Sequence, residues 1–249
     1  MSSEKQSSSS GIVDTLKTLL IAGAIALGFR SLVAEPFNIP SGSMIPSLLV
    51  GDYLFVTKYS YGYSRYSFPF GLAPIDGRLF SGDSQPQRGQ VAVFRLPSDT
   101  SVDYIKRVIG VPGDRIQVRQ GVLHINGQAV ERRLVGNGRQ DLSRGGQITT
   151  LYQETLPGGG THLIQEISDR QTFDNTPEYL VPPGHYFMMG DNRDNSRDSR
   201  SSSVGFVPIE NFIGEARFLF FSHDSSASVW ELWKWPSAVR FERLGNTIE

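Results

Sequence analysis

The 249-residue chain has no cysteine, only four histidines and nearly balanced charge. The absence of cysteine excludes disulfide bonds, thiol catalysis and cysteine-ligated zinc. With 24 basic and 25 acidic residues, the net charge is −1. Such a chain has no global field that attracts nucleic acid, so we expect no nucleic-acid partner. Glycine and proline are plentiful, at 26 and 14 residues. They indicate many turns and favour a β fold.

Long apolar runs are scarce, and the clearest one, residues 18–29, lies near the N-terminus. It becomes longer if Lys17 and Arg30 extend their aliphatic stems so that their charges reach the membrane surface. The segment then covers residues 15–34 and forms about 30 Å of helix, enough to cross a bilayer. We therefore expect one N-terminal transmembrane helix at 15–34, preceded by a tail of residues 1–14.

Two other interpretations of this segment stay open. A removable signal peptide would be cut after Ala34, but Leu32 is not the small residue that such a cut needs two positions earlier. Arg30 also lies where signal peptides are usually uncharged. The third interpretation is a buried core helix of a soluble protein.

Beyond residue 35 the sequence alternates apolar and polar residues or has short apolar runs bounded by turn residues, as β-strands do. The pair Asn126-Gly127 predicts a tight hairpin, since both positions of its turn need positive φ. Predicted strands lie at 52–59, 89–97, 102–130 (four short strands), 185–190 and 215–222.

The fold class that this pattern predicts is mainly β, with antiparallel sheets. Residues 131–179 are more polar and are broken by glycine, so we expect a smaller β subdomain inserted into a main β domain formed by 35–130 and 180–249. Residues 60–90 are rich in Tyr, Phe, Gly and Pro and predict a long ordered loop or ribbon. The three tryptophans near the C-terminus fit either a membrane–water boundary or ordinary packing of a C-terminal cap.

A hydroxyl-rich turn, Ser41-Gly42-Ser43-Met44, follows the apolar segment. A serine becomes a nucleophile only when a base removes its proton. Histidine is the commonest base, but none of the four in this chain lies in a recognisable triad motif, and we interpret them as structural. They are His124, His162, His185 and His223.

Lysine can replace histidine as the base if burial lowers its pKa from about 10.4, because an apolar environment disfavours the ammonium form. Lys106 lies in the apolar stretch DYIKRVIGVPGD. That stretch alone allows two interpretations: a lysine that points outward to solvent, which is the commoner case, or a buried base.

The loop GDNRDNSRDSR, residues 190–200, is rich in acidic and amide side chains, which also occur in calcium sites. An EF-hand loop needs glycine at its sixth position and glutamate at its twelfth. Counted from Asp191, those positions hold Ser196 and Ser202. We therefore expect no metal, and favour a loop that braces the site over an ordinary solvated turn.

The combination of the anchor, the PSGSMIPSL turn, the YIKRVIGVPGD strand and the GDNRDNSRDSR loop resembles the bacterial type I signal peptidase family, also called leader peptidases. The resemblance covers the anchor, 37–59, 88–130 and 186–221. Two positions depart from the family pattern: Gln90 replaces a usual aspartate and Ser47 a usual threonine. Neither lies in the proposed catalytic pair.

By this resemblance, Ser43 is the nucleophile and Lys106 the general base. Ser41 matches the residue whose hydroxyl joins the Ser43 N–H in binding the oxyanion. The resemblance assigns supporting roles to three further residues and a packing role to Met44. Ser196 would hydrogen-bond and orient the lysine, and the pair Asp198 and Arg200 would brace the site.

The resemblance implies a membrane-anchored serine endopeptidase that removes signal peptides after small residues, at Ala-x-Ala sites, without a cofactor. Its partners would be secretory preproteins and the lipid bilayer, and we expect a monomer. It would span the bacterial inner membrane once, with a cytoplasmic tail and a periplasmic catalytic domain. A substrate strand would pair with an exposed strand edge near Ser43, and the loop after Ser60 would border the pocket.

Two competing functions stay open. A self-cleaving regulator with a related dyad would need a DNA-binding domain and a scissile Ala-Gly before the serine. The only such pair is Ala22-Gly23, inside the apolar segment. A non-catalytic anchored β module that binds a partner is the other alternative.

Overall fold

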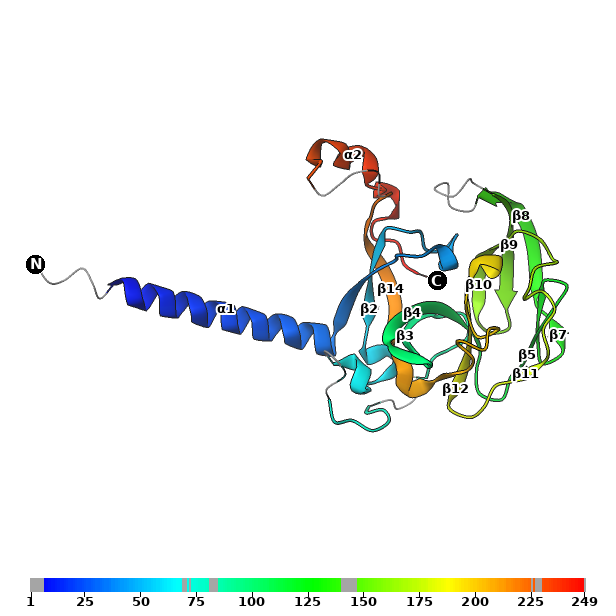
Figure 1. The fold of residues 1–249 in the computed structure, drawn as a ribbon, viewed down its shortest axis with the longest axis horizontal. Helices are drawn as coiled ribbons and strands as arrows, with labels where there is room; N and C mark the ends of the chain where they lie inside the picture. The colour runs from blue at the N-terminus through cyan, green and yellow to red at the C-terminus, as the bar shows by residue number, and fades with distance from the viewer. Residues whose placement is uncertain are drawn as a thin grey trace, which may run out of the picture.

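The computed structural model describes residues 7–68, 71, 73–80, 85–139, 147–224, 226 and 230–248. A long helix, α1 (Ser7–Leu32), projects away from a β-rich body (Figure 1). Its segment Gly11–Leu32 has a mean hydropathy of 1.8, is long and apolar enough to cross a membrane, and has none of its apolar window buried. The interpretation as a buried core helix is therefore wrong. The helix ends two residues before the predicted limit, because Pro36 cannot continue a helix and the chain becomes extended ahead of it.

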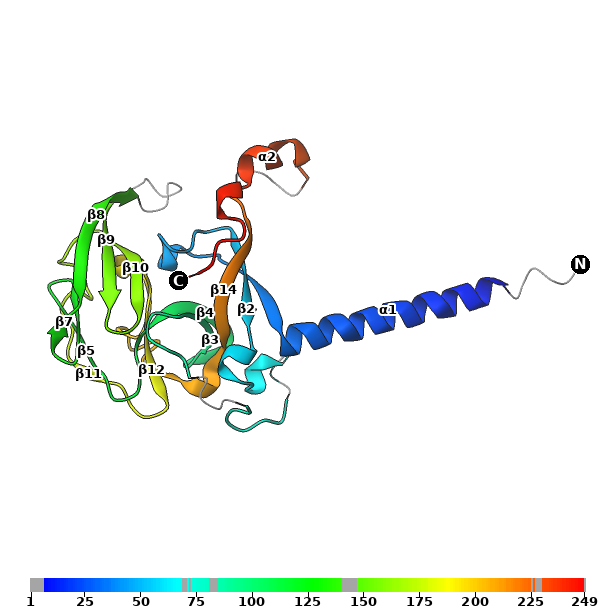
Figure 2. The ribbon, with the colours of Figure 1, turned by 180° about the vertical axis from the view of Figure 1, so that it is seen from behind.

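The largest sheet of the described residues has seven strands, paired antiparallel throughout. It combines segments from the start, middle and end of the chain, as the view from behind also shows (Figure 2). In spatial order the strands are β1 (Ala34–Asn38), β2 (Asp52–Thr57), β14 (Phe212–Ser222), β3 (Val91–Leu96), β4 (Asp99–Gly110), β12 (His185–Met189) and β13 (Val207–Pro208).

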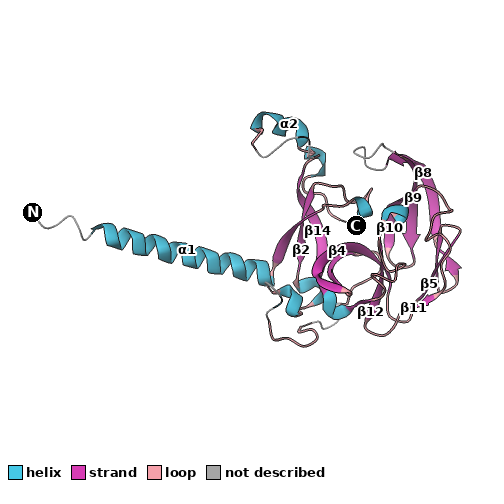
Figure 3. Ribbon diagram, viewed as in Figure 1, coloured by secondary structure: helices cyan, strands magenta, loops and turns pink. Residues whose placement is uncertain are grey.

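Two smaller antiparallel sheets lie on the side of the body away from α1 (Figure 3). One has the order β11 (Tyr179–Leu180), β5 (Arg115–Arg119), β6 (Val122–Ile125) and β7 (Gln128–Ala129). The other has the order β10 (Gly160–Glu166), β9 (Ile148–Leu156) and β8 (Glu131–Arg139). The prediction of a mainly β, antiparallel fold after one N-terminal apolar helix is confirmed. The three-stranded sheet falls inside the predicted insertion 131–179, of which residues 140–146 lie outside the described part.

The predicted hairpin at Asn126-Gly127 is confirmed. It joins β6 to β7, and the two residues have φ values of 52° and 81°. In the described part of residues 58–90 no strand forms; two short 3-10 turns and one bridge, Tyr63 to Leu79, give an ordered loop. The rest of that predicted loop (69, 70, 72 and 81–84) lies outside the described residues.

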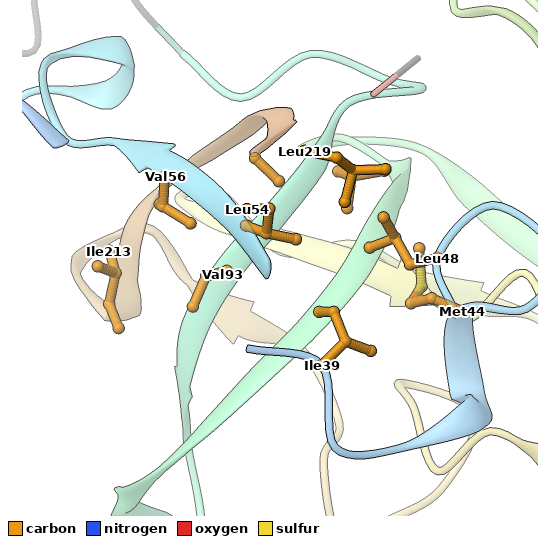
Figure 4. Packing of buried hydrophobic residues seen from close by; sticks show 10 residues of the cluster. Ile39, Met44, Leu48, Leu54, Val56, Val93, Ile213 and Leu219 are labelled. Atoms are coloured by element: carbon orange, nitrogen blue, oxygen red, sulfur yellow. The ribbon is translucent and has the colours of Figure 1, made fainter. Parts of the chain in front are cut away.

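The main apolar core lies under the turn that carries the candidate serine. Met44 and Leu48, just after Ser43, are fully buried and pack with side chains of β2, β3 and β14 (Figure 4). Met44 therefore has the packing role that the sequence predicts. Since the core holds both Met44 and Leu48, it fixes the position of the serine backbone between them and β1.

Near the C-terminus, the short helix α2 (Trp235–Ala238) stands away from the sheets (Figure 1). Trp230 and Trp233 are largely exposed. Among the described residues, Trp235 is the one tryptophan whose ring contacts an aromatic ring of the sheet, that of Phe221, at 6.3 Å between centroids. The packed-cap interpretation therefore applies to one tryptophan of the three.

Candidate active site

Ser43 lies in a 3-10 turn, Gly42–Met44, directly after edge strand β1. Lys106 lies on β4, opposite Ala92 of β3. Lys106 Nζ is 2.7 Å from Ser43 Oγ and donates a hydrogen bond of 2.8 Å to the carbonyl of Ile105. The turn after β1 and the strand β4 thus bring together the serine and the lysine that the sequence predicts.

Lys106 is 3 % exposed, so the interpretation that it points outward to solvent is wrong. Burial is the largest influence on its pKa, which falls to about 8, while the negative charges of Asp198 and Asp191 oppose the fall. With this pKa about a tenth of the amine is neutral at pH 7, far more than for a lysine in water, and the neutral form is the one that a general base needs.

Ser41 and Ser196 lie on two sides of this pair. Ser41 Oγ is 3.4 Å from Ser43 Oγ and faces the same cleft. Ser196 Oγ is buried and makes no hydrogen bond of good geometry with any described residue, although its hydroxyl helps to lower the pKa of Asp198. The expected bond from Ser196 to Lys106 is not made here. The Ile105 carbonyl, on the lysine's own strand, orients the amine instead.

The pair Asp198 and Arg200 is buried, with two hydrogen bonds of 2.9 and 2.8 Å. Burial alone would raise the pKa of Asp198, but the Arg200 guanidinium outweighs it and holds that pKa below its usual range. Asp198 also accepts the Gly190 N–H at 3.1 Å, and Arg200 donates to the carbonyl of Arg193 at 2.6 Å. The pair therefore ties the two ends of the 190–200 loop together.

A second buried ion pair lies beside the lysine and was not predicted from the sequence. Arg107, next to Lys106, donates to both oxygens of Asp191 at 2.9 and 2.8 Å, and to the Gly89 carbonyl at 2.6 Å. Both side chains are 1 % exposed. The available signal was a second charge, Arg107, inside an apolar strand, because a buried charge there requires a partner.

A third buried pair joins the loop to the three-stranded sheet. Arg193 donates to both carboxylate oxygens of Glu154, on β9. His162 lies beside this pair, 3.5 Å from Glu154 and 3.9 Å from Asp191, and burial lowers its pKa to about 4. No pattern in the sequence pointed to this cluster, since its members are far apart in the chain. None of the four histidines lines the cleft around Ser43.

The acidic side chains of the 190–200 loop are used separately. Asp191 and Asp198 pair with arginines, and Asp194 accepts the backbone N–H of Ile167 at 2.6 Å. Within the described part of the chain, no three His, Asp or Glu side chains gather where a metal ion could bind. Two of these side chains, Asp191 and Asp194, thus attach the loop to neighbouring segments.

The serine and lysine lie in an open cleft of about 880 Å³. Its walls come from β1 and the following turn, from the outer edge of β4, and from the 190–200 loop. No described residue of the loop 60–90 lines it, so the described part of this loop does not border the pocket as predicted. Residues 69, 70, 72 and 81–84 lie outside the described residues. The lining residues are Phe37, Asn38, Ile39, Pro40, Ser41, Ser43, Val93, Asp103, Tyr104, Ile105, Lys106, Phe173, Asp194, Asn195, Ser196, Arg197 and Ser201.

The fold and this cleft define a mainly β protein with a serine and a buried lysine in contact. Over residues 12–221 the chain matches the family described as signal peptidase, peptidase S26. It is 43 % identical over 243 residues to signal peptidase I of Rickettsia conorii, covering 90 % of this chain and 88 % of that protein. It is 41 % identical over 252 residues to signal peptidase I of Rickettsia canadensis, covering 93 % and 92 %.

Among solved structures, a signal peptidase I from Enterococcus faecalis matches with 25 % identity and a TM-score of 0.32, covering 53 % of this chain and 96 % of that one. The family match and the curated relatives together assign the chain. It belongs to the signal peptidase family, peptidase S26.

Proposed function

We propose that the protein is a membrane-anchored serine endopeptidase that cleaves signal peptides from exported preproteins, after small residues at Ala-x-Ala sites. One observation carries the proposal: the 2.7 Å contact between Ser43 Oγ and the buried Nζ of Lys106. Ser43 is the nucleophile and Lys106 the general base. Ser196, Asp198 and Arg200 support the pair.

In the proposed reaction, neutral Lys106 takes the proton of Ser43 as Oγ attacks the scissile carbonyl carbon. The resulting ammonium then gives that proton to the leaving amine, so that an acyl-enzyme remains. Water, activated by the same lysine, hydrolyses the ester. Lys106 can serve in each step because, among the described residues, no carboxylate contacts its amine and holds the proton there.

The developing oxyanion would accept hydrogen bonds from the Ser43 N–H and the Ser41 hydroxyl. In support, the two hydroxyl oxygens lie 3.4 Å apart, so both groups can reach one carbonyl oxygen. Removing one such donor typically costs about 10²–10³ in rate.

The substrate would lie in the cleft as an added strand. Two strand edges line the cleft and are open: β1 is the last strand of its sheet, and among the described residues Asp103–Lys106 of β4 pair only with β3. An extended peptide can hydrogen-bond to such edges, while shallow apolar walls restrict its side chains to small ones.

We further propose the arrangement at the membrane. Helix α1 spans the bacterial inner membrane once, residues 1–14 are cytoplasmic, and the catalytic domain is periplasmic. Residues 35–130 and 180–249 form that domain, and 131–179 is the inserted subdomain. The protein acts as a monomer, and its anchor restricts its encounters with preproteins to the membrane plane.

The test uses the full chain in detergent, as wild type, Ser43→Ala and Lys106→Met. Each is incubated with a preprotein that carries an Ala-x-Ala site, and mass spectrometry locates the cut. We expect a single cut after the second alanine by the wild type and none by either variant. Equal cleavage by Lys106→Met would remove the lysine from the mechanism.

A further inference from the structure

One buried residue outside the proposed catalytic pair donates hydrogen bonds to both peptide groups that flank the Ser43 Cα atom. Asn192 Nδ2 donates to the Gly42 carbonyl at 2.8 Å, and the Asn192 backbone N–H donates to the Ser43 carbonyl at 3.1 Å. Asn192 is fully buried. The two bonds therefore hold the backbone on either side of the nucleophile, and the Ile45 N–H is a second, longer donor to the Gly42 carbonyl, at 3.3 Å.

The first of these bonds acts on the peptide unit whose N–H would bind the oxyanion. The peptide between Gly42 and Ser43 is planar, and in a trans peptide the C=O and N–H point in opposite directions. Holding the Gly42 oxygen therefore sets the direction of the Ser43 N–H. Ser43 is the second residue of the 3-10 turn Gly42–Met44. The first N–H groups of a helix have no partner within it, so this N–H can bind a substrate oxygen.

We propose that Asn192 is a positioning residue that aims the Ser43 N–H at the developing oxyanion. This inference rests on the proposed serine-protease function and adds to it a residue outside the nucleophile, base and brace. Asn192 does not contact the lysine amine, so its effect passes through the backbone of the serine turn.

The surroundings of Asn192 suit this role. Its neighbours in sequence, Asp191 and Arg193, are held in buried ion pairs with Arg107 and Glu154. Asn192 also forms a parallel bridge with Gln165 of β10. Residues 191–193, and with them the Asn192 side chain, are thus attached to the main sheet on one side and to the three-stranded sheet on the other. A fixed donor is what oxyanion binding needs, since a displacement of about 1 Å can cost 10²-fold in rate.

The test compares Asn192→Ala with a matched variant, Asn211→Ala. Asn211 is also buried and also donates its Nδ2 to a backbone carbonyl, that of Arg95 at 2.9 Å, away from the cleft. We expect Asn192→Ala to lower kcat by roughly 10- to 100-fold with KM changed by less than about threefold, as for a lost transition-state interaction. Asn211→Ala should keep the wild-type kcat.

Two further readouts separate oxyanion binding from general loosening. A peptide aldehyde inhibitor forms a bond from Ser43 Oγ to its carbonyl carbon and so presents an oxyanion, whereas the matching peptide alcohol does not. Asn192→Ala should weaken the aldehyde by the same factor as kcat and leave the alcohol unchanged. The midpoint of the pH–kcat profile should not move, because the base is untouched.

An unchanged kcat in Asn192→Ala, an equal loss of aldehyde and alcohol binding, or a shifted pH midpoint would overturn the inference. If Asn192→Ala does not fold, Asn192→Asp decides, since it keeps the size and the backbone bond but loses the donor to Gly42; wild-type kcat in that variant would also overturn it. Ser43→Ala separates the two proposals. If Ser43→Ala cleaves the preprotein normally, the proposed function is wrong. If Ser43→Ala is inactive but the Asn192 variants cleave normally, only the inference about Asn192 is wrong.

Discussion

The molecule contains two buried lysines in different surroundings. Lys106, on β4, is 3 % exposed, and Lys58, just after β2, is 2 % exposed. Lys58 Nζ forms an ion pair with Glu35 at 2.8 Å and donates to the Ser67 carbonyl. In the described part of the chain, the groups within hydrogen-bond distance of Lys106 Nζ are neutral: a hydroxyl and a carbonyl.

Burial is the largest influence on the pKa of both amines and lowers both. At Lys58 the hydrogen bond and charge of Glu35 oppose the fall, whereas at Lys106 the carboxylates of Asp198 and Asp191 act without touching the amine. Burial alone therefore does not make a lysine a base. The amine must also lack a carboxylate in contact, so that losing its proton breaks no ion pair.

The largest expected effect is on activity. Lys106→Met should lower kcat/KM by about 10²–10⁴-fold, the usual contribution of a general base. Lys58→Met should stay within about threefold of wild type in molecules that remain folded, because Lys58 does not line the cleft. Preprotein cleavage assays at matched folded concentrations measure both, and equal losses in the two variants would end the distinction.

For stability we expect the reverse order: Lys58→Met should have the larger effect and Lys106→Met the smaller one. Lys58→Met leaves Glu35 without its buried partner and should lower the free energy of unfolding by about 3 kcal/mol. Arg30 still pairs with Glu35, so the loss falls at the low end of the usual range. Lys106→Met should be neutral or stabilising, because it removes an amine that burial penalises. Denaturant unfolding of the full chain in detergent measures both changes.

The pH dependence of cleavage should follow Lys106. Its pKa of about 8 means that the neutral amine is the minor form at pH 7 and the major form at pH 9. Activity should therefore rise roughly tenfold between those values, as the fraction of free base does. Lys58→Met should keep the same midpoint, and a profile that is flat from pH 6 to 9 would contradict the assignment.

The smallest expected effect is a change in the pKa of Lys58. Glu35→Gln removes the hydrogen-bonding charge that raises the pKa of Lys58, so this pKa should fall further. The activity midpoint should not move. Nuclear magnetic resonance of lysine side chains labelled at Nζ would follow the Lys58 titration, and an increase in its pKa would contradict the role assigned to Glu35.

The sequence was sufficient for the parts of the fold that local patterns determine. Asn126-Gly127 marks its hairpin by turn chemistry, and the apolar stretch around Lys106 is the strand it predicts. The two separate motifs that contain Ser43 and Lys106 indicated the pair by resemblance. Local patterns could not say whether Lys106 is buried, because alternation in a strand allows either face.

Long-range contacts were beyond such reasoning. The bond from Asn192 to Gly42 joins residues 150 positions apart, and no local pattern pairs them. The resemblance predicts that the aromatic loop 60–90 borders the cleft, but two of its described tyrosines make other contacts. Tyr61 packs edge-on against Phe212 in the core at 5.7 Å, and the Tyr63 hydroxyl donates to the last turn of α1, at Leu32.

The most direct test of the account is to titrate the amine of Lys106 by nuclear magnetic resonance in the full-length protein, with Lys106→Met to assign its signal. We predict a pKa of about 8, so that a measurable fraction of the amine is uncharged at neutral pH. A pKa above 10, as for a lysine in water, would contradict the claim that burial without a contacting carboxylate makes this residue the base.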